Sequence, residues 1–357
     1  MLAFAACDGD SSSVPSQEGR APDDAMFDGG PIPDAGIPVD STTGFKHRWC
    51  KDSTLSTTAQ LRAVWSTGPG QWIVAGTQGT VQRHNGTSWQ AIPTGDPTQL
   101  NGVWASNSND VYVVGESTAV RRFDGAVWSK IADASRVSRL NAIWGSDAQH
   151  IYTMGDSGNG TYVTVFEDGA WQTSVVSTTM AYNVKSIWST SSANLVIAGS
   201  LWNERQSMLG ILSYPWPLAK FHSVESAPVL YGIWGSEVHY GGNDEAGSPI
   251  LEEVFAVGSK GTIAHRVGNF TNWSTTFTSS NPTSVTLRGV WGTGTTDVVA
   301  VGDQGTILAY DGTSWNAEPI GTSVNLYAVT GSRTGQVMAV GDEGTILWRV
   351  NDGAACP

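Results

Sequence analysis

Seven residues at one position of a repeated phrase carry polar or amphipathic side chains, although their neighbours in the phrase are apolar or small. They are Arg62, Asn101, Asn141, Lys185, Tyr231, Arg288 and Tyr327. Three of them are cations and two are tyrosines, so together they could hold an anionic or sugar-like group. The alternative is that they are solvated residues that fill a wet channel.

A longer turn in the fourth copy of the repeat adds three candidates, Trp202, Glu204 and Arg205. An aromatic residue beside a charged pair is a common composition of a recognition hot spot. The competing interpretation is an insertion whose tryptophan folds back on its own sheet.

The fifth copy is expanded instead between Glu237 and Glu253, and this stretch is acidic. Its oxygen ligands could bind Ca²⁺, but it lacks the regular spacing of a calcium loop. We therefore expect a solvated loop there rather than a metal site.

Residues that would mark an enzyme show no recognisable spacing. The six histidines are scattered, with no HExxH motif and no ligand-like pair. Acidic residues on several expected loops would suit a glycosidase with paired carboxylates, but no pair stands out. The glycines lie at turns between strands, outside the strand-to-helix context of a phosphate-binding loop. We predict no catalytic residue, no metal and no cofactor.

The candidate residues belong to a block that occurs seven times. Each copy opens with leucine or valine, any residue, a small residue, an aliphatic residue and tryptophan, except that the last copy has Thr330 in place of the tryptophan. An apolar run that ends in glycine follows in every copy, at Gly76, Gly115, Gly155, Gly199, Gly258, Gly302 and Gly341. A period of about 40 residues with four short strands is typical of a propeller blade.

The predicted fold is all-β, a seven-bladed β-propeller of four-stranded antiparallel blades. Pairs such as Asp311-Gly312 predict the turn between the third and fourth strands, because glycine accepts a positive φ. We expect most of the sixteen tryptophans to pack where blades meet. The seven polar residues would then frame the mouth of the central channel, on the face that bears the second-to-third turns.

Four acidic residues follow the repeated glycine in these turns. We expect their carboxylates to accept from nearby backbone N–H groups and so to fix the turn. They are Glu116, Asp156, Asp303 and Asp342.

The last copy has only three full strands before Pro357. Residues 45–51, which include Trp49, precede the first copy and are predicted to supply the missing strand of the last blade. Cys50 lies on this strand, and Cys356 stands where other blades place tryptophan. A disulfide between them would close a loop of about 300 residues and contribute roughly 4 to 5 kcal/mol in the chain-entropy model, less any strain. The alternative is two unrelated thiols.

Residues 1–7, MLAFAAC, resemble the end of a bacterial lipoprotein signal, with Cys7 as the lipid-accepting residue. Residues 8–44 are rich in Asp, Ser, Pro and Gly, so we predict a disordered acidic tether, followed by the propeller at 45–357. A lipid anchor and a disulfide both imply an oxidising compartment. We expect the bacterial cell envelope or a secreted protein, attached to a membrane only through lipid.

Much of the formal net charge of −13 lies in the tether. Because the chain has no basic stripe that could release counterions from phosphates, its composition disfavours nucleic acid as a partner.

The WGS, VGDxGTI and DGxxW phrases resemble those of predicted propellers in secreted proteins and lipoproteins of bacteria, notably of the myxobacterial type. The biochemical role of that group is largely unknown. More distantly, DGTSW at residues 311–315 resembles a shortened Asp-box of sialidase and BNR-type propellers, where the box is a structural turn opposite the active site. The resemblance implies the fold and no activity.

We therefore predict a non-catalytic binding or assembly module at the cell envelope, monomeric, with an envelope protein or glycan on the mouth face. The second hypothesis is a carbohydrate-active enzyme or lectin that uses the mouth. The third is an assembly chaperone of the kind suggested by propellers with similar repeats in photosynthetic complexes.

Overall fold

The computed structural model describes residues 47–134, 136–156, 160–177, 181–191, 194–201, 203–213, 218–223, 229–237, 251–267, 278–280, 282–332 and 334–356. Cys7, the segment 8–44, Trp202 and the greater part of the stretch between Glu237 and Glu253 lie outside these residues, so the expectations for them stay predictions.

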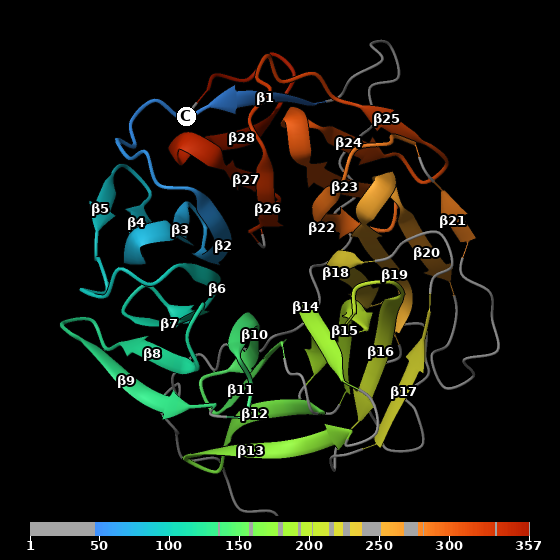
Figure 1. Cartoon of the computed structure of the whole chain (residues 1–357). Helices are drawn as coiled ribbons and strands as arrows, with labels where there is room; N and C mark the ends of the chain where they lie inside the picture. The colour runs from blue at the N-terminus through green and yellow to red at the C-terminus, as the bar shows by residue number, and fades with distance from the viewer. Residues whose placement is uncertain are drawn as a thin grey trace, which may run out of the picture.

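The described strands form consecutive groups of four that are arranged as a closed ring (Figure 1). Blades 1 to 3 are β2 (Leu61–Gly68), β3 (Gln71–Gly76), β4 (Val81–Asn85) and β5 (Trp89–Ala91); β6 (Leu100–Asn107), β7 (Asp110–Gly115), β8 (Ala119–Phe123) and β9 (Trp128–Asp133); and β10 (Arg139–Asp147), β11 (His150–Asp156), β12 (Thr161–Glu167) and β13 (Ala170–Ser177). Blades 4 and 5 are β14 (Tyr182–Ser191), β15 (Asn194–Leu201), β16 (Ser207–Ser213) and β17 (Leu218–His222); and β18 (Leu230–Glu237), β19 (Leu251–Gly258), β20 (Ile263–Val267) and β21 (Thr278–Ser280). Blade 6 is β22 (Leu287–Gly294), β23 (Asp297–Gly302), β24 (Ile307–Tyr310) and β25 (Trp315–Ala317).

The last blade combines both ends of the repeat region: β26 (Leu326–Gly331), β27 (Val337–Gly341), β28 (Ile346–Asn351) and, outermost, β1 (His47–Lys51). Blades 3 and 4 are hydrogen-bonded into one sheet through the single pair Asp156 and Asn183. Every strand pairing is antiparallel within the described residues, so the predicted all-β propeller of four-stranded antiparallel blades is confirmed.

The repeated glycine is needed for space. Gly302 pairs with Leu287 in the neighbouring strand, and a Cβ at Gly302 would lie 2.2 Å from the carbonyl oxygen of Thr286. The equivalent Cβ at Gly76 would lie 1.9 Å from the oxygen of Gln60. Glycine therefore allows the inner two strands to approach closely at the mouth end of the blade.

Short 3-10 turns follow this glycine in four blades, η1 (Thr77–Gly79), η2 (Ser259–Gly261), η3 (Asp303–Gly305) and η4 (Asp342–Gly344). The turn between the third and fourth strands of blade 6 is also as predicted. Asp311 Oδ1 accepts from the backbone N–H groups of Thr313 and Ser314 at 2.8 Å each, and Gly312 has a φ of +92°.

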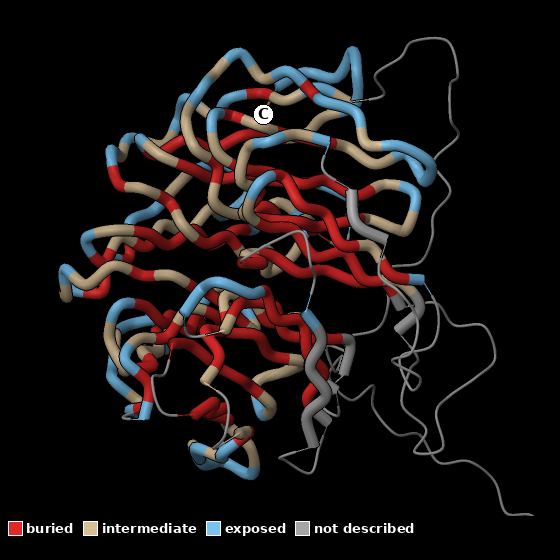
Figure 2. Tube along the Cα trace, turned by 45° about the vertical axis from the view of Figure 1, so that its right-hand side comes forward, coloured by how far each residue is buried: buried red, intermediate tan, exposed pale blue. Residues whose placement is uncertain are grey.

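The tryptophans of the opening phrase connect one blade to the next. Trp291 lies against Gly331 and Trp234 lies against Gly292, where a Cβ would come within 2.0 Å and 2.7 Å of the indole. In the next blade, the residue that follows the tryptophan position must therefore be small. These side chains lie in the core as predicted, and Figure 2 shows burial concentrated along the strands.

The seam between blades 7 and 1 is built differently, because Thr330 stands where the other blades have tryptophan. There Trp72 of β3 and Trp348 of β28 are both buried and meet edge to face, with ring centroids 5.6 Å apart. Two aromatic rings on other strands thus supply the apolar surface that the missing tryptophan would have contributed.

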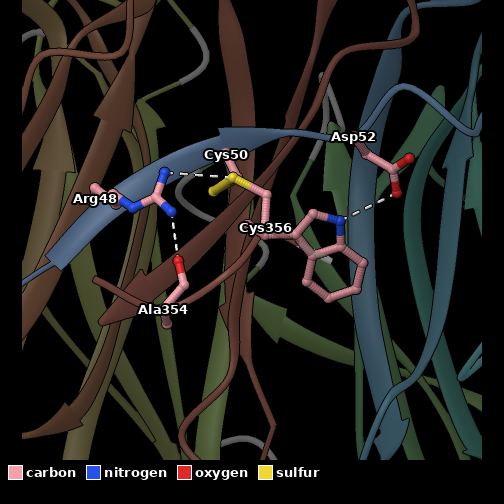
Figure 3. Close-up of a disulfide and its surroundings, with 6 residues drawn as sticks. Arg48, Cys50, Asp52, Ala354 and Cys356 are labelled. Carbon is pink, nitrogen blue, oxygen red and sulfur yellow. Dashed lines mark hydrogen bonds between the residues drawn. A yellow bond between two sulfur atoms is a disulfide. The ribbon is translucent and has the colours of Figure 1, made fainter. Parts of the chain in front are cut away.

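The ring is closed by β1, in which Cys50 is paired with Trp348 of β28. Cys50 and Cys356 form a disulfide with Cα atoms 5.6 Å apart, a usual separation (Figure 3). Arg48 donates to the carbonyl oxygen of Ala354 and to the sulfur of Cys356. The closing strand and the disulfide are both confirmed.

None of the helices in the described part of the chain is long and apolar enough to cross a membrane.

Candidate functional site

The seven polar residues lie at the mouth-face ends of the inner strands, and contacts link neighbouring blades. Asn101 donates to the carbonyl oxygen of Leu140 at 3.1 Å, and Asn141 donates to that of Val184 at 2.9 Å. The guanidinium of Arg62 lies 4.7 Å from the ring centroid of Tyr327. The structure thus brings residues of different blades together into the predicted ring.

In blades 2 to 4 this ring is held by internal acceptors. Asp156, which is 3% exposed, accepts from Asn141 at 2.6 Å, from Arg139 at 2.6 Å and from Lys185 at 3.2 Å. Asn101 donates to Glu116 at 3.3 Å. These donors are occupied by the protein itself, so this part of the mouth is structural.

Blades 5, 6, 7 and 1 contribute a different group, the Arg–Tyr arc, which consists of Tyr231, Arg288, Tyr327 and Arg62. The guanidinium of Arg288 lies 5.4 Å from the ring centroid of Tyr231 and 5.3 Å from that of Tyr327. A guanidinium over an aromatic face is attracted by the ring quadrupole. Four side chains from four blades are therefore in contact along one side of the mouth.

The acidic partners in this arc are Asp303 and Asp342. Arg288 donates to both oxygens of Asp303, from Nε at 2.5 Å and from Nη2 at 3.0 Å. Burial lowers the pKa of Arg288, but the hydrogen bond and charge of Asp303 outweigh it, so the net shift is upward. Tyr327 donates its hydroxyl to Asp342 at 3.0 Å, and burial together with this hydrogen bond raises the pKa of Tyr327.

Arg62 differs from the other cations of the ring. Its Nη2 donates to Gln60 Oε1 at 3.1 Å, whereas its Nε is buried without an acceptor. Among the described residues it has no carboxylate partner. The reason lies in the repeat, because Thr77 stands in blade 1 where Asp303 stands in blade 6.

The acidic residues of the second-to-third turns have a role that the sequence did not indicate. In the described residues the side chains of Glu116, Asp156, Asp303 and Asp342 accept from side chains of the mouth. We expected backbone N–H groups of the turns as their donors, and among the described residues, which omit 157–159 after Asp156, none donates to these carboxylates. The carboxylates fix the mouth residues.

The turn of the fourth blade is partly described. Glu204 lies with its Oε1 3.6 Å from Lys185 Nζ, which places this turn at the mouth as expected. Arg205 is exposed, and its backbone N–H donates to Asn203. Trp202 lies outside the described residues, so the hot-spot hypothesis is untested.

The metal hypothesis for the fifth blade falls mostly outside the described residues as well. Glu253, at the end of that stretch, lies 3.5 Å from His265. The described part of the chain contains no cluster of three or more metal-ligating side chains.

Sequence reasoning overlooked the position that precedes the opening phrase. Gln60, Arg139 and Asn325 occupy it, and each bonds to a mouth residue or to a mouth carboxylate. An alignment of the seven copies would have shown this second polar position and the exchange of acid for Thr77.

Comparison with known proteins places the fold. No protein-family model matches the chain, and no curated protein matches its sequence. A solved structure of YCF48 from Cyanidioschyzon merolae superposes with a TM-score of 0.65 at 15% identity, covering 84% of this chain and 98% of that one. The shared architecture is the β-propeller.

Two other solved structures give the same result. A structure of YCF48 bound to D1 peptide has a TM-score of 0.64 at 16% identity and covers 86% of this chain and 96% of that one. The WD40 β-propeller domain of Doa1 has a TM-score of 0.64 at 11% identity and covers 86% and 98%. At these identities the likeness concerns the fold.

Proposed function

We propose that this protein is a non-catalytic binding or assembly module whose protein partner docks on the mouth face, at the Arg–Tyr arc. The observation that carries the proposal is Arg62, whose buried Nε has no acceptor in the described residues although it lies at the mouth. A similar propeller, YCF48, has been observed with a bound D1 peptide, so a ring of this fold can hold a peptide.

A protein partner suits the arc better than a glycan does. Sugar rings are usually bound against open aromatic faces, but guanidinium groups lie over the rings of Tyr231 and Tyr327. The mouth carboxylates Asp156 and Asp303 are bound by Arg, Asn and Lys donors, which favours a structural role over catalysis. A lectin or carbohydrate-active enzyme is therefore the second candidate.

Display at the bacterial cell envelope is part of the proposal. The disulfide between Cys50 and Cys356 fits an oxidising compartment, and the sequence before Cys7 resembles a lipoprotein signal. The module would thus be held at a membrane by lipid and meet its partner outside the cytoplasm.

The test compares two arginine variants of the full chain as immobilised baits in envelope extract. Arg62→Ala removes the one mouth cation that has no ion pair among the described residues, whereas Arg83→Ala removes a cation that is hydrogen-bonded to Asn109 and Gln90, away from the arc. Arg288 is less suitable for the test because its removal would also leave the carboxylate of Asp303 without its cation.

We expect mass spectrometry to identify a protein that is retained by the wild type and by Arg83→Ala but released by Arg62→Ala. A partner retained equally by all three baits would rule out docking at the arc. A glycan array probed in parallel would favour the lectin if it gives a ligand that the Arg62→Ala chain no longer binds.

A further inference from the structure

Arginine occupies the mouth position in two blades, and the two side chains have unequal partners. In Arg288 the edge formed by Nε and Nη2 meets both oxygens of Asp303. In Arg62 the same edge meets one oxygen of Gln60, which accepts from Nη2 only. The Nε of Arg62 is left without an acceptor in the described residues.

The difference is caused by one substitution within the repeat. Thr77 begins the η1 turn as Asp303 begins the η3 turn, and the backbone N–H of Gln60 donates to its hydroxyl at 3.0 Å. Blade 1 therefore has an arginine at the mouth but no carboxylate of its own. A buried donor without an acceptor costs stability, so such a group in a folded protein calls for an explanation.

A carboxylate is the acceptor whose shape fits. Its two oxygens match the planar edge of a guanidinium, as the pair of Arg288 and Asp303 shows. It would replace the single oxygen of Gln60 and satisfy Nε and Nη2 together. Tyr327, over whose ring the guanidinium lies at 4.7 Å, holds the group in place for this contact.

We propose that Arg62 is the receptor for one carboxylate of the protein partner, an inference that rests on the proposed function of the mouth face. Arg288 is paired with Asp303, and the carboxylate of Asp342 accepts from the neutral donors Tyr327 and Asn325. The two arginines are thus matched by two carboxylates, so the arc has no excess positive charge that would favour a polyanion, and Arg62 can take one carboxylate. The carboxylate belongs to a chain end or to an acidic side chain, and the probes below separate the two.

The test observes the Nε–H resonances of arginine by NMR in the full chain during titration with small probes. N-acetylglycine carries a terminal carboxylate, N-acetylglutamate α-amide carries a side-chain carboxylate, and N-acetylglycinamide is the neutral control. Glucuronate represents an acidic sugar. We expect the Arg62 resonance to shift with the two peptide carboxylates and not with the neutral amide, while the resonances of Arg288 and Arg83 stay in place.

A pair of matched variants supplies the decisive control. Thr77→Asp gives Arg62 the carboxylate that Arg288 already has, in a turn that accommodates aspartate in blades 6 and 7, so the chain should fold normally. It should weaken binding of the carboxylate probes by about tenfold or more, since a charge-assisted bidentate contact is lost to the ligand. Ser259→Asp adds the same charge at the equivalent turn position of blade 5 and should leave binding unchanged.

The outcomes separate this inference from the proposed function. No response of Arg62 to any carboxylate, or equal binding by Thr77→Asp and the wild type, overturns the carboxylate site even if the bait experiment still shows docking at the arc. If glucuronate binds more tightly than both peptide probes, the inference that the carboxylate belongs to a protein partner is overturned. If the bait experiment shows that the Arg62→Ala chain retains the partner as well as the wild type does, the proposed function itself is overturned.

Discussion

Asp52 connects the two ends of the ring, and we expect it to make the stability of the seam depend on pH. It follows β1 directly, and its Oδ2 accepts from the indole N–H of Trp89 in blade 1 at 3.0 Å and of Trp348 in blade 7 at 3.1 Å. Its Oδ1 accepts from the backbone N–H and the hydroxyl of Thr54. Figure 3 shows Asp52 in the surroundings of the disulfide, accepting a hydrogen bond from an indole that lies between them.

Burial raises the pKa of Asp52, but the hydrogen bonds from Thr54 and from the two indoles outweigh it, so the net shift is downward. A depressed pKa in the folded state means that the ionised carboxylate adds stability above its unfolded value of about 3.9. This contribution is lost as the pH falls through the folded value. Acid should therefore loosen the seam between blades 7 and 1.

The change Asp52→Asn tests the contribution of the carboxylate at neutral pH. The amide keeps one acceptor oxygen and replaces the other with an N–H₂ group, so either the two indoles or the two Thr54 donors lose their acceptor. Two donors left without an acceptor at about 1 kcal/mol each, the lower end of the range because the site is half-buried, give a loss of about 2 kcal/mol in the free energy of unfolding.

Urea denaturation followed by tryptophan fluorescence measures this loss near pH 7 and again at successively lower pH, and the difference between Asp52→Asn and the wild type should shrink as the pH falls through the folded-state pKa of Asp52. Asp124→Asn is the control, because Asn85 already occupies the equivalent turn in blade 1 and accepts the same two backbone bonds. Equal midpoints for Asp52→Asn and the wild type at neutral pH would refute the reasoning.

Three further changes test other contacts. Cys356→Ser should lower stability by roughly 4 to 5 kcal/mol, less any strain, and non-reducing mass spectrometry of the wild type should find the peptide of Cys50 joined to that of Cys356. Arg349→Met leaves two partly or fully buried carboxylates without their cation, so calorimetry should show a loss of about 3 kcal/mol or more; an unchanged melting temperature would contradict this. Gly302→Ala brings a methyl group against the carbonyl oxygen of Thr286 and should reduce soluble yield or lower the urea midpoint, whereas Gly321→Ala, with no atom nearby, tests the strain of its positive φ alone.

The repeat determined most of the fold because every copy but the last carries the strands of one blade. The opening phrase and the glycine recur in the same order in all copies, and the structure places them where the pattern predicts, as it does the Asp-Gly turn of blade 6. Closure by residues 47–51 could also be inferred, since the last copy lacked a fourth strand and Trp49 matched it.

Contacts between blades could not be inferred in the same way. Arg349 of β28, which is 5% exposed at its side chain, bonds to Asp297 of blade 6 at 2.7 Å and lies 3.4 Å from Glu318. Trp49 donates to Glu318 at 2.6 Å. No spacing within one copy marks such a group, because its members come from different copies and from both ends of the repeat region.

The hydrogen-bond partners of the mouth residues could not be predicted from the sequence either. The polar type and the blade position of Arg62 and Asn141 were evident from the sequence, but their partners were not. Whether a mouth side chain has a hydrogen-bond partner within the protein depends on a residue in the next turn or the next blade. Asp156 shows this, because it accepts from both Asn141 and Lys185. The chemical difference between the two arginines emerged only from these pairings.

The direction of β1 places the first described residue of the chain away from the mouth face. His47 lies beside Asn351, and Lys51 lies beside Leu347, close to where β28 leaves the η4 turn of the mouth face. His47, the first described residue, therefore lies toward the face opposite the mouth, so the described chain enters the propeller on one side of the ring and Arg62 lies on the other.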